Sequence, residues 1–323
     1  MSRTRVLPPN GKNLALAAEL LRRGELVAFP TETVYGLGAR AYDASAARRV
    51  YKAKGRPSDN PLIVHVADEA MLAEVVRRVT PLARRLMDAY WPGPLTLILE
   101  KSARVPGDVT AGGRTVAVRC PGHPAARALI RALGEPVAAP SANRSGRPSP
   151  TTAAHVLRDL RGRVPLILDG GPCRKGLEST IVDARGRRPV VLRHGTITAE
   201  AIARAAGAPL RAAGLGAPPA PGTRHRHYAP MCRVVVATPA LVRGGALVMG
   251  AAGAGLVHRS PWPGRRPAFV RRVRGGVQAY AAALFAAMRD AEAAGVKTLF
   301  VESVPDRGVG RAVMDRLRRA ARR

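Results

Sequence analysis

Short apolar runs alternate with helix-like stretches along the first two hundred residues of the chain. Most of these runs are continuous rather than alternating, a pattern typical of strands that are covered on both faces. The predicted strands are residues 26–30, 61–66, 95–99, 116–119, 137–139, 166–169, 179–183 and 190–193. The predicted helices are residues 13–23, 44–51, 69–76, 81–89, 125–132 and 152–160. The pattern therefore predicts a mixed α/β domain with one large sheet.

The pattern changes after residue 207. Residues 217–222 read Ala-Pro-Pro-Ala-Pro-Gly, which cannot readily form a helix or a central strand and so predicts a linker. The end of this linker is rich in His, Arg and Tyr, unlike a passive Gly/Ser spacer. Beyond it, strand-like and helix-like runs predict a smaller parallel-sheet α/β domain. Strands are predicted at residues 233–237, 246–249 and 296–301, and helices at 277–294 and 310–321. The predicted units are residues 1–207, a linker at 208–230, and residues 231–323.

The composition is compatible with a sizeable core, since 46% of the residues are hydrophobic. No apolar run approaches the ~18–20 residues that a membrane span needs, and the first ten residues lack the apolar segment of a secretory signal. The three cysteines, Cys120, Cys173 and Cys232, are far apart and have no zinc-site spacing. These features predict a cytoplasmic protein without a membrane contact.

The formal net charge is +31, from 53 Lys and Arg against 22 Asp and Glu. Such a charge attracts polyanions such as nucleotides and RNA. Arg far outnumbers Lys, however, and Ala, Gly and Pro are abundant, which a GC-rich genome would also produce. The charge alone therefore leaves nucleic-acid contact open.

Familiar nucleotide-binding and catalytic motifs are absent. There is no Walker A motif, no GxGxxG after a strand, no GxSxG and no HExxH. The nearest approach to a Walker A motif lies at residues 171–176, where the lysine precedes the second glycine instead of following it. Any phosphate site must therefore use another geometry.

Two polar clusters follow strands in the first third of the chain. Residues 30–38, PTETVYGLG, place Thr and Glu at a strand end before flexible glycines, a composition suited to a small polar ligand or to an ordinary loop. In residues 51–61, Lys54 and Arg56 flank Gly55, and two such cations in a stiff turn can grip phosphate oxygens. A solvated basic loop would have the same composition. His65 follows in the next strand, where a core histidine is the alternative.

Two further clusters lie in the second half of the first domain. Residues 140–149, PSANRSGRPS, offer Ser and Asn groups that can orient a nucleotide or a carboxylate, although a plain connector would have a similar composition. Residues 169–171, DGG, precede the polar start of the strand at 179–183, and Arg193-His194-Gly195 ends the next strand.

Together, the clusters closely resemble the Sua5/YrdC/YciO family of threonylcarbamoyl-AMP synthases. PTETVYGLG, KAKGRPSDNPL, WPGPLTLIL, APSANRSGRPSPT, GLESTIVD and LRHG occur in the family's order over residues 23–195. PGTRHRHYAP and the final residues resemble the C-terminal domain of Sua5, which makes this the long, two-domain form. The resemblance implies a YrdC-like twisted mixed sheet with flanking helices around a basic cavity, plus a smaller Rossmann-like α/β domain.

The resemblance also implies a reaction. L-threonine and bicarbonate form a carbamate, whose carboxylate attacks the α-phosphate of ATP to give threonylcarbamoyl-AMP and pyrophosphate. Mg²⁺ would bridge phosphate oxygens. The product would pass to threonylcarbamoyl transferase machinery that modifies tRNA, and the basic surface could contact tRNA.

By the same resemblance, each of the family's functional positions has a counterpart here. The catalytic KxR and SxN signature corresponds to Lys54, Arg56, Ser141 and Asn143, with Lys54 expected to stabilise the reacting anions. The ATP-binding positions are Arg56, Asn60, Thr115, Ser141, Ser149, Arg193 and Tyr228. The threonine-binding positions are Thr33, His65, Arg119, Ala139 and Ser179, with Arg119 expected to pair with the threonine carboxylate. No side chain is assigned to a metal.

The linker is expected to act as a lid that excludes water, with Tyr228 reaching toward the nucleotide. The family linker commonly has Met and Tyr where this chain has Thr223 and His225. His227-Tyr228-Ala229-Pro230 is intact, so the inferred lid is weakened but not removed.

Two other functions fit parts of the sequence. A basic surface could hold RNA without catalysis, although such binding does not need the KxR and SxN pairs. A carbamoyl-phosphate-dependent enzyme is the second alternative, because the larger hydrogenase-maturation proteins contain related domains. Those proteins also carry zinc fingers, which three scattered cysteines cannot supply here.

Overall fold

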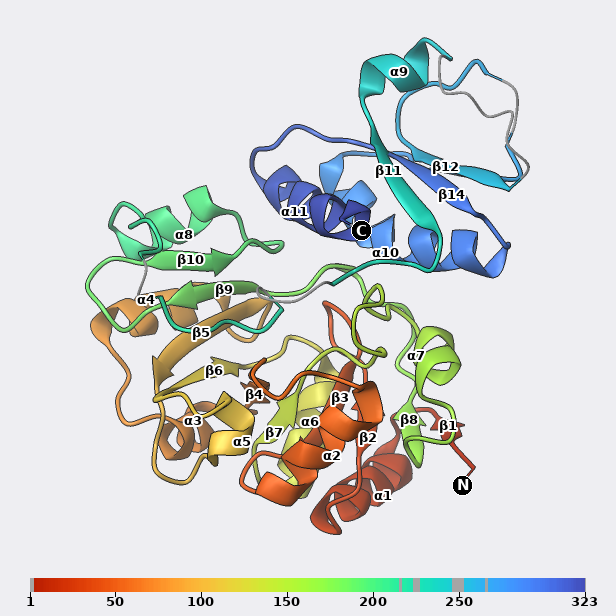
Figure 1. The fold of residues 1–323 in the computed structure, drawn as a ribbon. Coiled ribbons are helices and arrows are strands. Elements are labelled where there is room, and N and C mark those ends of the chain that lie inside the picture. Colours follow the sequence, from red (N-terminus) through yellow and green to blue (C-terminus); the bar gives the residue numbers. More distant parts are fainter. Residues whose placement is uncertain (1–2, 215–216, 223–226, 246–252, 265–266, 323) are drawn as a thin grey trace.

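The computed structural model describes residues 3–214, 217–222, 227–245, 253–264 and 267–322. The chain forms a larger N-terminal α/β unit and a smaller C-terminal α/β unit, each built on its own sheet (Figure 1). Within the described ranges, no helix is both apolar enough and long enough to cross a bilayer. The expected mixed α/β fold with a second, parallel sheet is confirmed.

The N-terminal unit contains a ten-stranded mixed sheet in the order β1-β8-β2-β3-β7-β4-β6-β5-β9-β10. Its strands are β1 Arg5–Leu7, β2 Val27–Phe29, β3 Gly36–Arg40, β4 Ile63–His65, β5 Leu95–Glu100, β6 Thr115–Arg119, β7 Val137–Ala139, β8 Leu166–Leu168, β9 Thr180–Asp183 and β10 Val190–Arg193. β4 and β6 are parallel, and their last residues, His65 and Arg119, are register partners. This pairing places two polar side chains side by side at the carboxyl ends of neighbouring strands.

Eight helices flank this sheet: α1 Gly11–Arg22, α2 Ala44–Lys54, α3 Glu69–Val75, α4 Pro81–Tyr90, α5 Gly107–Thr110, α6 Pro124–Leu133, α7 Ala153–Leu160 and α8 Ala199–Ala206. α2 begins where Asp43 accepts hydrogen bonds from the amides of Ser45 and Ala46. It ends at Gly55, whose φ of 61° is the left-handed conformation that glycine adopts without strain. This cap turns the chain sharply between Lys54 and Arg56.

The glycines at residues 36–38, expected to be flexible, lie in a strand that the sequence analysis did not predict. These residues begin β3, which pairs antiparallel with β2. A Cβ at Gly36 would lie 3.0 Å from Cζ of Phe29, and one at Gly38 would lie 2.9 Å from Cγ1 of Val137. Both glycines therefore permit close packing against neighbouring side chains.

Among its described residues, the C-terminal unit contains four parallel strands in the order β11-β14-β12-β13. The strands are β11 Arg233–Ala237, β12 Ala254–His258, β13 Phe269–Arg272 and β14 Thr298–Glu302, and the helices are α9 Pro239–Arg243, α10 Val277–Ala293 and α11 Val309–Ala321. β12 and β13 were not predicted, because Gly255 interrupts one apolar run and arginines occupy half of the other. The strand predicted at residues 246–249 lies outside the described residues.

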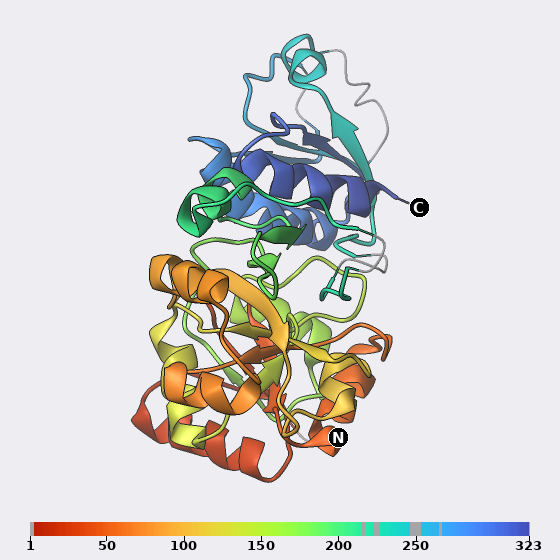
Figure 2. The same cartoon turned by 90° about the vertical axis from the view of Figure 1, so that its left-hand side faces the viewer.

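α10 and α11 lie between the second sheet and the N-terminal unit (Figures 1 and 2). Gly176 has a φ of 65°, and a Cβ there would lie 2.1 Å from the carbonyl oxygen of Ala282 in α10, so the two units approach closely. Across the same interface Arg289 pairs with Asp159 at 2.7 Å, and both side chains are fully buried. Buried ion pairs of this kind need a fixed geometry, so the two units dock in a defined orientation.

Candidate active site

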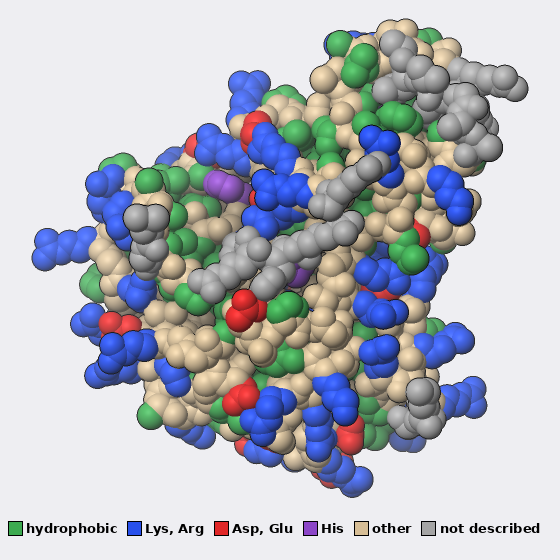
Figure 3. Space-filling view, in the orientation of Figure 1, with side chains coloured by type: hydrophobic (Ala, Val, Ile, Leu, Met, Phe, Trp, Pro, Cys, Tyr) green, Lys and Arg blue, Asp and Glu red, His purple; other side chains and the backbone are tan. Residues whose placement is uncertain are grey.

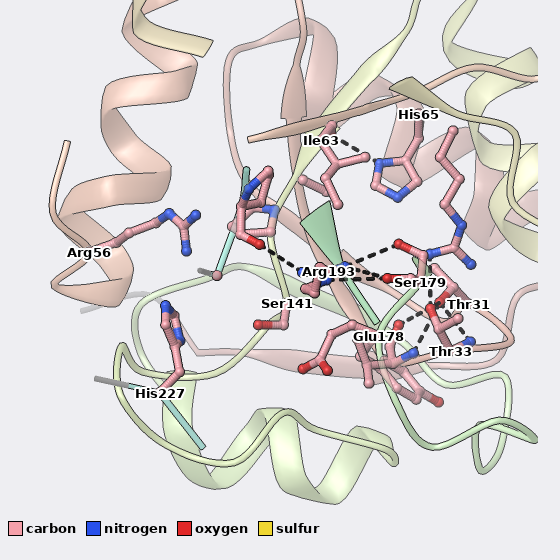
Figure 4. Close-up of a pocket in the computed structure, with 18 of the residues that line it drawn as sticks. Thr31, Thr33, Arg56, Ile63, His65, Ser141, Glu178, Ser179, Arg193 and His227 are labelled. Atoms are coloured by element: carbon pink, nitrogen blue, oxygen red, sulfur yellow. Dashed lines mark hydrogen bonds between the residues drawn. The ribbon is translucent and has the colours of Figure 1, made fainter. Parts of the chain in front are cut away.

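A small cavity lies between the large sheet and the linker residues 221–222 and 227–228, with about 50 Å³ of free volume. It is lined by Thr31, Thr33, Val34, Tyr35, Gly36, Arg56, Ile63, His65, Arg119, Ala139, Pro140, Ser141, Glu178, Ser179, Arg193, Pro221, Gly222, His227 and Tyr228. Figure 4 shows that these side chains come from several strand ends and from the linker, and that they converge on one space.

Arg56 and Arg193 supply positive charge on one side of the cavity, and both are buried. Nε and Nη2 of Arg56 donate to the carbonyl oxygens of Asn60 (3.0 Å) and Pro61 (2.8 Å), so the turn after α2 holds this side chain. Burial lowers the pKa of Arg56 to about 10, which leaves it charged at neutral pH. Arg193 donates to the carbonyl oxygen of Ser179 from Nε (3.2 Å) and Nη2 (3.0 Å).

Arg119 also lines the cavity and already has a carboxylate partner. Its Nη2 lies 2.6 Å from Oε1 of Glu32, and Nη1 donates to Oγ1 of Thr33 at 2.9 Å. Burial opposes ionisation of Glu32, but the charge of Arg119 outweighs it, and the pKa of Glu32 is lowered. Arg119 is expected to pair with the threonine carboxylate, and part of its charge is matched by Glu32 within the protein.

Lys54 does not line the cavity but joins two of the sequence clusters. Its ammonium group donates to the carbonyl oxygens of Ser141 and Asn143. Burial, and then the charge of Arg56, lower its pKa well below the usual value. Ser141 donates in turn to Oδ1 of Asn143. The turn carrying Lys54 and Arg56 is thus in direct contact with the loop carrying Ser141 and Asn143.

Comparison with known proteins accounts for both units of the chain. Residues 19–195 match the Sua5, YciO and YrdC family model, which is described as "Telomere recombination". Residues 197–322 match the model described as "Threonylcarbamoyl-AMP synthase, C-terminal domain". The chain belongs to the Sua5/YciO/YrdC family, in the two-domain Sua5 form.

Relatives from distant organisms resemble this Sua5 chain over nearly its whole length. The threonylcarbamoyl-AMP synthase of Bacillus subtilis is 44% identical over 98% of this chain and 94% of its own length. That of Pyrococcus abyssi is 40% identical over 95% of this chain and 94% of its own. The crystal structure of P. abyssi Sua5 complexed with L-threonine is 39% identical and has a TM-score of 0.88 over 99% of this chain and 97% of that one.

The threonine-side positions assigned from the Sua5 resemblance all line the cavity. They are Thr33, His65, Arg119, Ala139 and Ser179. Burial, followed by the charge of Arg119, lowers the pKa of His65 to about 3, so its imidazole is neutral at physiological pH. Thr33 also contacts Oγ1 of Thr31 at 2.8 Å, which fixes its hydroxyl group.

The positions expected to bind ATP do not all line the cavity. Arg56, Ser141, Arg193 and Tyr228 line it, whereas Asn60 and Ser149 do not, and neither does Asn143 of the catalytic signature. Thr115 lies at the far end of β6, four residues from Arg119, and lines a separate open hollow with Arg77, Glu100, Lys101, Ser102, Ala103, Arg114 and Arg185. Because side chains alternate along a strand, Thr115 still lies on the same face of β6 as Arg119.

Described residues of the Sua5 linker, Pro221, Gly222, His227 and Tyr228, form part of the cavity wall. The amide of Gly222 donates to Oδ1 of Asn60 at 3.2 Å, and Nδ2 of Asn60 lies 3.3 Å from Nε2 of His227. Nη1 of Arg193 donates to the carbonyl oxygen of Pro221 at 2.9 Å. Thr223 and His225, where the linker departs from the family pattern, lie outside the described residues.

Sequence reasoning missed three cavity or near-cavity groups: Glu32, Glu178 and His227. Glu32 and Glu178 lie within the quoted motifs PTETVYGLG and GLESTIVD, so the motifs themselves contained the signal. His227 was noted in the linker without a role. Its contact with Asn60 joins residues 167 positions apart, which periodicity along the chain cannot predict.

Proposed function

We propose that this protein is a threonylcarbamoyl-AMP synthase, which joins L-threonine, bicarbonate and ATP and releases pyrophosphate. The observation that carries the proposal is the contact of Lys54 with the loop carbonyls of Ser141 and Asn143, beside a cavity that Arg56 and Arg193 line. The family membership and the named synthases of similar length support it. Residues 1–207 would then be the catalytic unit, 208–230 the lid and 231–323 the supporting domain.

On this proposal the triphosphate lies on the side of Arg56 and Arg193. Two buried guanidinium groups, each held by backbone carbonyls, favour a polyanion and lose little entropy on binding it. Ser141, Asn60 and Ser149 would contact or orient the nucleotide from the adjoining loops. Thr115 would meet only a part of the nucleotide that extends along β6 beyond the cavity.

L-threonine lies on the side of Arg119 on the same proposal. The Arg119–Glu32 pair is compatible with a substrate that carries both an ammonium and a carboxylate group. Arg119 would face the carboxylate, while the neutral His65 adds no charge that would oppose the ammonium group. Thr33 and Ser179 offer hydroxyl groups, and Ala139 leaves room for the substrate.

The reaction needs no covalent enzyme intermediate. The threonine nitrogen loses a proton and attacks the bicarbonate carbon, and loss of water gives a carbamate. A carbamate oxygen then attacks the α-phosphorus and pyrophosphate leaves. The chain contributes positioning and a cationic surround for the developing charge.

Mg²⁺ fits this cavity only when it is bound by the phosphate oxygens of ATP. Both carboxylates near the site, Glu32 and Glu178, are paired with arginines. Across the described ranges, no group of three or more His, Cys, Asp or Glu side chains could hold a metal ion. The ion would therefore arrive with ATP and neutralise phosphate charge.

The linker must move for the substrates to enter. Ligand pockets commonly measure about 300–1,000 Å³, whereas the free volume here is about 50 Å³. Closure after binding would exclude water from the labile carbamate. A cytoplasmic location and transfer of the product to tRNA-modifying machinery are part of the same proposal.

The face of the molecule seen in Figure 3 has no single basic track for RNA. Figure 3 shows Lys and Arg side chains spread over the visible face rather than gathered in one stripe. The net charge of +31 would favour a salt-dependent attraction for tRNA.

The purified protein is expected to release pyrophosphate from ATP only when both L-threonine and bicarbonate are present. A coupled pyrophosphate assay, with each substrate omitted in turn, tests this directly. Mass spectrometry of the product should detect threonylcarbamoyl-AMP. Tight RNA binding with no substrate-dependent pyrophosphate release would instead favour a non-catalytic RNA-binding protein.

A further inference from the structure

Side chains of the C-terminal unit pack against the ring of Tyr228 in the linker. The Tyr228 ring stacks on Phe285 of α10, with centroids 5.4 Å apart and an interplanar angle of 24°. The guanidinium carbon of Arg316, on α11, lies 5.1 Å from the centroid of the same ring. Tyr228 has a φ of 69°, a conformation that costs energy in a residue other than glycine and persists where the surroundings hold it.

Arg316 also holds a carboxylate of the cavity wall. It is fully buried, and its Nε donates to Oε2 of Glu178 at 3.1 Å. The other oxygen of Glu178 accepts a hydrogen bond from Oγ of Ser149, which belongs to the loop that follows Ser141 and Asn143. One arginine of the second domain is thereby connected both to the linker and to the loop of the N-terminal unit.

The contact between Arg316 and Glu178 affects nucleotide binding because Glu178 carries a negative charge. Glu178 lines the cavity, so an unpaired carboxylate there would repel a triphosphate at close range. Its pairing with Arg316 neutralises that charge and fixes the acceptor for Ser149. Removal of one partner of a buried ion pair leaves an uncompensated charge, so the effect is expected to be large.

We propose that Arg316 is a positioning residue that couples closure of the linker to the nucleotide site. It seats Tyr228 in the closed linker and neutralises Glu178, so that the second domain completes the site for ATP. The inference rests on the proposed function, because it names the nucleotide side of that cavity. By linkage, ATP binding should stabilise the closed linker as much as the closed linker favours ATP.

The test compares the dissociation constant of a non-hydrolysable ATP analogue, measured by titration calorimetry, across four full-length proteins. Arg316→Gln is expected to bind the analogue about tenfold or more weakly than the wild type, while the KM for threonine changes less than twofold. Arg311→Gln is the matched control: Arg311 lies on the same helix and pairs across the interface with Glu200 at 3.4 Å, but both side chains are partly exposed. This control is expected to bind like the wild type.

The fourth protein is a double variant that tests whether the unpaired charge of Glu178 causes the loss of ATP affinity. Glu178→Gln combined with Arg316→Gln keeps an acceptor for Ser149 and removes the unpaired carboxylate, so it should recover most of the lost ATP affinity. A merely structural role of Arg316 would not predict this recovery. Equal loss in the single and double variants, or unchanged binding in Arg316→Gln, overturns the proposal.

Two further measurements distinguish the role of Arg316 from a folding defect and from a failure of the proposed function. If Arg316→Gln does not fold, as judged by its thermal unfolding, Phe285→Leu removes only the stacked face of Tyr228 and should weaken ATP binding about threefold; unchanged binding there overturns the inference. If the wild type binds the ATP analogue but releases no pyrophosphate with threonine and bicarbonate, the proposed function fails while the comparison of affinities still decides the role of Arg316.

Discussion

Replacing Lys54 with alanine is expected to lower threonine-dependent pyrophosphate release by about 10²–10³-fold. Lys54 joins the carbonyls of Ser141 and Asn143, so its loss frees the loop that faces the nucleotide and leaves two buried acceptors without a donor. Arg56→Ala should cause a loss of similar size by removing a charge from the cavity itself. Steady-state assays at saturating ATP and threonine measure both effects.

Lys52→Ala serves as the control for these variants. Lys52 lies in the last turn of the same helix but is exposed, so its removal should leave turnover unchanged. Thermal unfolding should show that the Lys54 and Arg56 variants stay folded. Wild-type turnover in either variant would remove that residue from the catalytic account.

Replacing both His227 and Tyr228 with alanine is expected to lower kcat/KM for bicarbonate by about tenfold or more. His227 contacts Asn60, and Tyr228 packs between Phe285 and Arg316, so the double variant loses two of the side-chain contacts that hold the linker. Water then reaches the carbamate, which should decompose before it meets the α-phosphate. Pyrophosphate release measured against bicarbonate concentration should reveal the loss.

Met231→Ala is the matched control, since Met231 is 84% exposed and lies just beyond the linker. A chain cut between Ala217 and Pro221 should likewise lose most of its activity. Full activity of residues 1–207 alone would show that neither the lid nor the second domain is needed.

The sequence predicted strands best where apolar residues form continuous buried runs. β4, β5, β6 and β7 all lie where such runs occur. β3 was missed because Gly36 and Gly38 read as a loop, although their small size is what allows Phe29 and Val137 to pack against them. The edge strand β13 was missed because arginines hide its pattern. Tertiary packing, not local propensity, decides both cases.

The sequence could predict those residues of the site that belong to recognisable motifs. Lys54 contacts Ser141 and Asn143 directly, although almost ninety positions separate it from these two signature residues. What motifs could not reveal are partners that only the folded chain brings together. Arg316 meets Glu178 across 138 positions, and no periodicity or spacing connects α11 with the cavity wall.

The most direct test of the central claim is a crystal structure of the full-length protein with L-threonine and a non-hydrolysable ATP analogue. The account predicts both ligands in the one cavity, with phosphate oxygens at Arg56 and Arg193 and the threonine carboxylate toward Arg119. A nucleotide bound elsewhere, with the Arg56 and Arg193 side chains free of phosphate, would contradict it.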